Sequence, residues 1–174
     1  MGNIKLSSKS ELTSGHDLSS GNDHGLSQFK PNTTVAAVIH HKGKFLLVEE
    51  KENDRMVFNQ PAGHLEENES LISAIQREVL EETGLTLAPD FLCGIYYFHR
   101  PDLKLYFLRF CFVFELTQFL QGQPQDDEII NTHWFTLAQI KEKCAQLRSS
   151  MVLECVEDYL AGNKIPLSQL KSNL

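Results

Sequence analysis

The sequence predicts one α/β domain in which a mixed β-sheet carries helices on both faces. The chain has 174 residues, 41% hydrophobic and 22% charged, which suits a single globular domain with a sizeable core. Strand-like segments dominate the chain, and one central and two late helical segments accompany them. Since each helix must bury an apolar face, this content favours helices packed against both faces of a sheet.

Runs of β-branched, apolar and aromatic residues predict the strands. They cover residues 33–41, 44–50, 56–60, 91–99, 105–116 and 132–135. Lys42 and Gly43 separate the first two runs, which predicts a hairpin. Pro101 and Asp102 join the two long aromatic-rich runs, where we expect a turn.

Helical periodicity predicts three helices. Residues 70–83 form the central one, and Gly84 follows at the position where a helix commonly ends. Residues 137–147 and 151–161 form the two C-terminal ones, and Gly162 closes the second. The central helix is the part of the chain with the densest charge.

Residues 1–28 differ in composition from the rest of the chain. They are rich in Ser, Gly, Asn and Asp, and their few leucines show no sustained period. Such a segment cannot bury enough apolar surface to offset the entropy of ordering it. We therefore expect a mobile tail at residues 1–28 and a folded domain at residues 29–174.

Charge and cysteine content exclude several classes of function. The 16 Lys and Arg residues against 23 Asp and Glu residues give a net charge of −7, which disfavours binding to nucleic acid. The longest apolar runs have strand length, so we expect no membrane segment. Four scattered cysteines and the lack of an apolar leader predict reduced thiols in a cytoplasmic protein. A monomer and a homodimer are both compatible with these patterns.

Glu78, Glu81 and Glu82 lie close together on the central predicted helix. At ~100° per residue they spread over about 100° of one helix face. Like charges this close repel one another, and near a helix C-terminus they also oppose the helix dipole. A divalent cation such as Mg²⁺ or Mn²⁺ would turn the repulsion into coordination. The alternative is an ordinary solvated acidic face.

Two neighbouring features favour the metal site. Arg77 directly precedes Glu78 and can pair with the nearby carboxylates, which would hold them in place. Gly63 lets the backbone approach closely before the helix, and the carbonyl of Ala62 offers a further hard oxygen ligand.

The spacing of these residues resembles the Nudix box, the signature of the Nudix hydrolase family. The box reads Gly, five residues, Glu, seven residues, then Arg-Glu-U-x-Glu-Glu-x-Gly-U with U aliphatic, and every specified position is present. They are Gly63, Glu69, Arg77, Glu78, Val79, Glu81, Glu82, Gly84 and Leu85. Chance would produce this match on the order of 10⁻¹⁰ times per starting position.

The resemblance implies the Nudix α/β/α sandwich, a mixed sheet with the box helix and two C-terminal helices. It also implies Mg²⁺-dependent hydrolysis of a small molecule in which a nucleoside diphosphate is linked to another group, with Mn²⁺ able to substitute. The implied metal ligands are Glu78, Glu81, Glu82 and the carbonyl of Ala62. Glu69 and Arg77 would form a bracing pair.

Two carboxylates compete for the role of general base. The resemblance favours Glu78, at a position where the family often places a ligand that also orients the attacking water. Glu128 is the second candidate, because it lies in an acidic loop before His133 where many Nudix enzymes place an acid. An ordinary acidic loop is the alternative interpretation of that segment.

A more detailed resemblance extends over residues 29–168, to a group of bacterial Nudix phosphatases. It rests on segments such as FNQPAGHLEENESL and LYFLRFCFVFEL. It implies release of phosphate from nucleoside tri- and diphosphates and from the thiamine-precursor hydroxymethylpyrimidine pyrophosphate. Phe58 replaces a Trp of that group, and His133 replaces an Arg. The alternatives are a nucleotide-housecleaning or ADP-ribose pyrophosphohydrolase, and a non-catalytic nucleotide-sensing module.

Substrate contacts are predicted from residue chemistry. Asn59 and Gln60 offer amide groups to a base edge. Phe58 and Tyr97 offer rings for stacking, although strand aromatics more often pack inward. Arg109 offers a cation to phosphate, and a solvated strand edge is its alternative interpretation.

Overall fold

A computed structural model describes residues 28–174 of the chain. The predicted tail therefore lies outside the described residues except for Gln28, and the domain boundary proposed there stays a prediction. Across the described part of the chain, no helix has the length and apolar character needed to cross a membrane. The following description concerns Pro31–Leu174.

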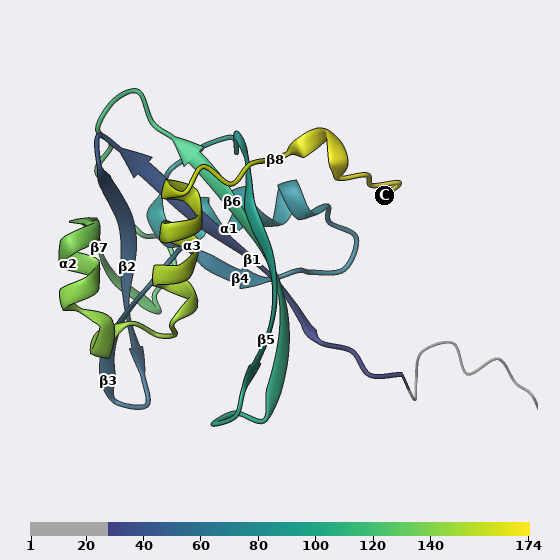
Figure 1. The fold of residues 1–174 in the computed structure, drawn as a ribbon, viewed down its shortest axis with the longest axis horizontal. Coiled ribbons are helices and arrows are strands. Elements are labelled where there is room, and N and C mark those ends of the chain that lie inside the picture. The colour runs from purple at the N-terminus through teal and green to yellow at the C-terminus, as the bar shows by residue number, and fades with distance from the viewer. Residues whose placement is uncertain (1–27) are drawn as a thin grey trace, which may run out of the picture. The chain divides into compact units, whose positions relative to one another are not determined.

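The strands form one mixed sheet (Figure 1). They are β1 (Asn32–His41), β2 (Lys44–Glu52), β3 (Arg55–Asn59), β4 (Ala62–His64), β5 (Phe91–Arg100), β6 (Leu105–Glu115), β7 (Ile129–Thr136) and β8 (Ile165–Pro166). The order β3-β2-β1-β6-β5-β8 forms the main path, while β4 pairs with β1 and β7 pairs with β2. β1 and β6 run parallel and the other pairs are antiparallel, which confirms the predicted mixed sheet.

Helices cover both faces of this sheet. They are α1 (Leu71–Thr83), α2 (Leu137–Glu142) and α3 (Met151–Leu160), with short 3₁₀ turns at Cys144–Gln146 and Leu167–Gln169. Side chains of β1 alternate between the two faces. Val35 and Ala37 pack with the α1 side chains, and Ala36 and Val38 pack with those of α2 and α3. The α/β/α sandwich predicted from the sequence is thus confirmed.

Local sequence explains where α1 begins and ends. The Ser70 hydroxyl accepts a hydrogen bond from the Ser73 N–H at 3.1 Å, and Gly84 ends the helix with a φ of +70°. Ile75 and Val79 are fully buried against the sheet. The adjacent face of α1 carries the box carboxylates, of which Glu78 and Glu82 are also buried.

The helix predicted at residues 137–147 is shorter in the structure. α2 ends at Glu142, and the chain then turns so that the Arg148 N–H donates to the Phe58 carbonyl at 2.9 Å. This pairing with β3 is a long-range contact that helical periodicity does not reveal. β4 and β8 were also missed, because segments of three and two residues are too short to show a period.

Candidate active site

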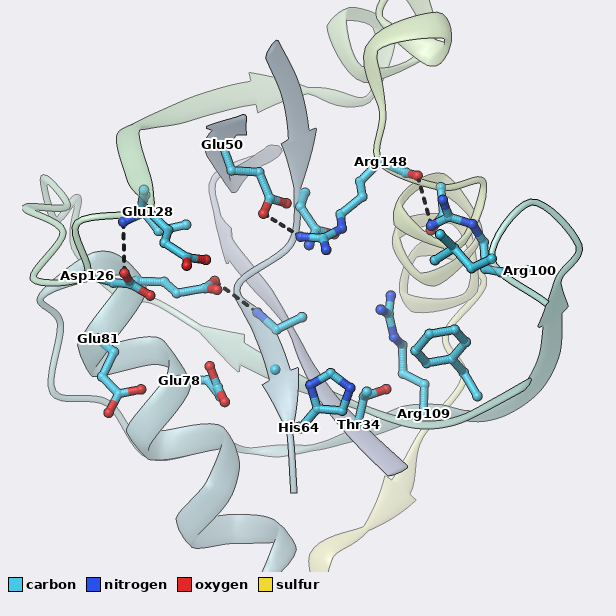
Figure 2. Close-up of a pocket in the computed structure, with 18 of the residues that line it drawn as sticks. Thr34, Glu50, His64, Glu78, Glu81, Arg100, Arg109, Asp126, Glu128 and Arg148 are labelled. Carbon is cyan, nitrogen blue, oxygen red and sulfur yellow. Dashed lines mark hydrogen bonds and ion pairs between the residues drawn. The ribbon is translucent and has the colours of Figure 1, made fainter. Parts of the chain in front are cut away.

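A cavity of about 470 Å³ opens between α1 and the strands β1, β2, β5 and β6. Figure 2 shows acidic side chains gathered on one wall and arginines on the other. The acidic wall comprises Glu78, Glu81, Glu82, Asp126 and Glu128, while Glu50 lies between the two walls and pairs with Arg148. The basic wall comprises Arg100, Arg109 and Arg148. The cavity thus separates charge across the space where a ligand would lie.

Arg77 organises the carboxylates at the base of the acidic wall. Its Nη1 lies 2.7 Å from Glu78 Oε1 and 3.1 Å from Glu81 Oε2. On its other side, Nη2 donates to Glu69 Oε1 at 2.8 Å and to the His64 carbonyl at 3.0 Å. The hydrogen bond from Arg77 lowers the pKa of Glu69. The Arg77 guanidinium therefore links the segment before α1 to the helix itself. This is the bracing role predicted for Arg77 and Glu69.

Glu82 is 8% exposed, as Glu78 is, so two of the three box glutamates are buried. The Ala62 N–H donates to Glu82 Oε2 at 3.0 Å, and the side chain lies in surroundings that desolvate it. Burial above all, together with the nearby carboxylates of Glu78 and Glu50, raises the pKa of Glu82 to about 9. Burial also raises the pKa of Glu78, against the opposing effect of Arg77. Glu78 has the Arg77 guanidinium as a partner, whereas Glu82 forms no ion pair within residues 28–174.

The donor set fits a hard divalent cation. As the side chains stand in residues 28–174, no three His, Cys, Asp or Glu side chains are arranged to enclose a metal ion. The wall nevertheless offers only carboxylate and carbonyl oxygens, and the uncompensated burial of Glu82 is the condition that a cation would relieve. Glu78, Glu81, Glu82 and Ala62, all of which line the cavity, would hold the ion.

Replacing Glu82 by Gln tests this interpretation. The folded-state pKa of Glu82, about 9, lies above its ordinary value of 4.5, so the folded protein binds this proton more tightly than the unfolded chain does. The resulting stabilisation is complete below about pH 4.5 and is lost as the pH rises toward 9. Glu82→Gln keeps an acceptor for the Ala62 N–H and cannot ionise, so it does not carry this pH-dependent loss of stability. In EDTA at pH 8 we expect its Tm to exceed that of the wild type, by roughly 2–4 °C for each kcal/mol regained.

The same variant should lose the response to metal. Mg²⁺ should raise the Tm of the wild type and leave that of Glu82→Gln nearly unchanged, because a cation that binds only the folded state stabilises it. Glu81→Gln is the matched control for the pH effect, since the Glu81 side chain is 46% exposed. A Glu82→Gln variant that melts below the wild type in EDTA at pH 8 would contradict the interpretation.

The loop that carries Glu128 is attached to the end of α1. The Gln125 and Asp126 N–H groups donate to the Glu81 carbonyl at 2.8 and 2.9 Å, and the Gln123 N–H donates to the Thr83 carbonyl at 2.7 Å. These bonds satisfy carbonyls that a helix end leaves unpaired. They bring Asp126 and the exposed Glu128 to the acidic wall, although Asp126 was not singled out from the sequence.

Two further cavity residues were missed by sequence reasoning. Glu50 lies on β2, where its Oε2 pairs with Arg148 Nη1 while its Oε1 is buried without a hydrogen-bond partner among the described residues. The β2–β7 pairing shifts register between Glu49 and Glu50. This shift interrupts the regular alternation of side chains between the two faces of the sheet, so the sequence does not reveal which face Glu50 is on. Arg148 reaches the cavity only because the chain leaves α2 early.

The predicted substrate residues divide into two groups. Asn59 and Arg109 line the cavity, whereas Phe58, Gln60 and Tyr97 do not. Phe58 is buried edge-to-face against His133 and Phe135, with ring centroids 5.5 and 5.2 Å away. Its ring is therefore a core side chain.

Gln60 and Tyr97 depart from the prediction for opposite reasons. Gln60 is 0% exposed, and its amide nitrogen lies 3.5 Å from the Ala37 carbonyl oxygen. Tyr97 is 61% exposed and stacks on Tyr106 outside the cavity. The alternation of β5 turns Phe98, and not Tyr97, toward the cavity.

The comparison with known families agrees with this geometry. Residues 29–154 match the family described as NUDIX domain. The chain belongs to the Nudix family. This Nudix chain is a hydrolase that acts on phosphorus-containing acid anhydrides, and its substrates are small phosphate compounds.

Curated relatives and solved structures narrow the similarity within the Nudix family. Phosphatase NudJ of Shigella boydii is 43% identical over 142 residues, covering 82% of this chain and 92% of the relative. NudJ of Escherichia coli K12 is 42% identical over the same shares. A NUDIX hydrolase from Nitrosomonas europaea aligns with a TM-score of 0.77 at 44% identity, covering 82% of this chain and 97% of that one.

A more distant Nudix structure shares the fold alone. The NUDIX domain of Shewanella oneidensis NrtR, solved with ADP ribose, aligns with a TM-score of 0.69 at 19% identity, covering 81% of this chain and 94% of that one. Identity this low supports the sandwich of the Nudix hydrolases and carries no argument about ligands.

Proposed function

We propose that this Nudix hydrolase is a Mg²⁺-dependent phosphatase of the NudJ type, with Mn²⁺ able to substitute. Its proposed substrates are nucleoside tri- and diphosphates and the thiamine-precursor hydroxymethylpyrimidine pyrophosphate, from which it releases phosphate. The observation that carries this proposal is the division of the cavity into an acidic and a basic wall. Similarity to NudJ over 82% of the chain supports the choice of phosphate as product.

The acidic wall supplies the groups that activate water. A bound divalent cation neutralises phosphate oxygens and acidifies water. Arg77 bonds to Glu78 Oε1, which leaves Oε2 to accept a proton. In the proposed step, the water oxygen forms a bond to phosphorus and Glu78 takes a proton from that water. The P–O bond to the leaving group breaks, and its electron pair stays on the leaving oxygen. Glu128 is the alternative proton acceptor, from the loop attached to α1.

The basic wall supplies the groups that hold the substrate. Arg100 and Arg109 lie across the cavity from Glu78 and Glu81, and Arg148 lies beside Glu50, with which it pairs (Figure 2). Guanidinium groups bind phosphate oxygens through paired N–H donors. A polyphosphate chain that meets the acidic wall at one phosphorus is thereby kept in place for attack.

A substrate panel with separate detection of phosphate and pyrophosphate tests the proposal. The panel contains ATP, ADP, hydroxymethylpyrimidine pyrophosphate, an oxidised nucleoside triphosphate and ADP-ribose, each with Mg²⁺ and with Mn²⁺. Phosphate from the first three supports the NudJ-type activity. Pyrophosphate from the triphosphates, or AMP from ADP-ribose, would favour a housecleaning or ADP-ribose pyrophosphohydrolase. No turnover of any compound would favour a sensing module.

Location and assembly are part of the same proposal. We propose a cytoplasmic protein, which the four free cysteines support, three of them being buried. We also propose that it is a monomer or a homodimer, which light scattering at several concentrations would distinguish. Larger assemblies would contradict this part of the proposal.

A further inference from the structure

Arg109 is a buried cation that forms no ion pair with any residue of the part of the chain that the structure describes. It lies on β6, directly opposite Thr34 of the parallel strand β1, and its side chain points into the cavity (Figure 2). The residue is only 9% exposed, and its Nε and Nη1 atoms have no hydrogen-bond partner among the described residues. A buried guanidinium in this state has lost its water without gaining an acceptor, which is unfavourable.

The other two arginines of the basic wall are already paired. Arg100 Nη2 lies 2.7 Å from Asp102 Oδ2, and Arg148 Nη1 pairs with Glu50 Oε2. Within residues 28–174 no carboxylate forms an ion pair with Arg109. Burial and the neighbouring charges of Arg148 and Arg100 lower the pKa of Arg109. Arg109 can therefore pair with an anion that enters the cavity.

The surroundings of Arg109 suit a tetrahedral oxyanion. The Thr34 hydroxyl is buried without a hydrogen-bond partner among the described residues, and it lies on the neighbouring strand at the same register position. The Phe98 ring lies 5.6 Å from the guanidinium carbon, which supports the cation on its face and leaves its N–H edges for a ligand. A guanidinium edge and a hydroxyl together match the several oxygens of one phosphoryl group.

We propose that Arg109 and Thr34 form a subsite for the terminal phosphoryl group of the substrate. The inference rests on the proposed function and deepens it. A terminal phosphoryl group has three non-bridging oxygens and ends the chain, so it suits a subsite made by two residues that are 9% and 4% exposed. The phosphoryl groups of ADP-ribose are internal, because each is linked on both sides. The subsite therefore favours substrates that end in phosphate, such as nucleoside tri- and diphosphates.

Binding of inorganic phosphate to the metal-free protein tests the subsite without turnover. We expect the wild type in EDTA to bind phosphate by titration calorimetry, and Arg109→Met to bind it at least ~10-fold more weakly, as loss of a charged hydrogen-bonding group predicts. Arg55→Met is the matched control, because Arg55 lies on β3 outside the cavity and is exposed. Its affinity should equal that of the wild type.

Kinetics provide the second measurement. Arg109→Met should raise KM about 10-fold for ADP and ATP and leave any KM for ADP-ribose unchanged, since only the former present a terminal phosphoryl group. If Arg109→Met does not fold, Thr34→Val provides the same comparison with a near-isosteric side chain. Equal phosphate affinity in the wild type and in a folded Arg109→Met or Thr34→Val variant would overturn the subsite.

The two proposals fail in different ways. A wild type that binds phosphate through Arg109 in EDTA but hydrolyses nothing in the substrate panel contradicts the proposed function and supports the subsite. A wild type that releases phosphate from ADP, with the same KM in Arg109→Met, supports the proposed function and overturns the subsite.

Discussion

Glu78→Gln is expected to lower kcat by about 10³-fold while the fold stays intact. The carboxylate that accepts the proton is removed, and loss of a general base costs roughly 10²–10⁴ in rate. A glutamine still accepts the hydrogen bond that Arg77 Nη1 gives to Oε1 at 2.7 Å. The rate of phosphate release at saturating substrate and Mg²⁺ gives kcat, and far-UV circular dichroism with a melting curve checks the fold.

Glu128→Gln is the comparison that separates the two candidate bases. Glu128 lines the same cavity but is exposed, and its N–H donates to Asp126 Oδ1 at 2.8 Å, an interaction that the substitution preserves. We expect Glu128→Gln to retain most of the activity. If only Glu128→Gln lowers kcat by orders of magnitude, the proton acceptor is on the loop and the assignment to Glu78 is wrong.

Gly63→Ala is expected to abolish most of the activity with little change in stability. A Cβ placed on Gly63 would lie 2.0 Å from Glu78 Oε1, so the carboxylate must move. The obstacle is the end of a flexible side chain, and the protein can therefore fold around it. Displacing a catalytic group by about 1 Å can cost roughly 10²-fold in rate. Activity and Tm measured on the same preparation test the expected loss of activity and the expected retention of stability.

Gly43→Ala should give the opposite result. Gly43 has a φ of +78° in the β1–β2 turn, and a Cβ placed there would meet no other atom within 4 Å. Alanine is strained at this φ by about 1 kcal/mol, which corresponds to a Tm lower by roughly 2–4 °C. Because the turn is outside the cavity, activity should be retained. A Gly63→Ala enzyme as active as Gly43→Ala would show that Glu78 does not depend on this close approach.

The pattern of residues within one continuous segment was enough to predict helix α1 and the side chains on its surface. Ser70, the apolar positions and Gly84 all belong to one continuous helical segment, so capping and periodicity are visible in the sequence itself. The same is true of the box spacing, which places Glu78, Glu81 and Glu82 on the face that α1 turns to the cavity. For this reason the fold class and the acidic part of the site followed from the sequence.

Tertiary structure decided the rest of the cavity. Glu50 and Arg148 reach it through a register shift in β2 and an early end of α2, and both depend on pairing between segments far apart in the chain. Tyr97 turns away because strand alternation fixes only that neighbours face opposite sides, and not which side is the cavity. The sequence by itself thus determined the acidic box on α1, through contacts between residues close in the chain. Only the assembled sheet decided that Arg109 and Thr34 would lie opposite it, buried and with polar atoms left unpaired among the described residues, because burial is a property of the whole fold.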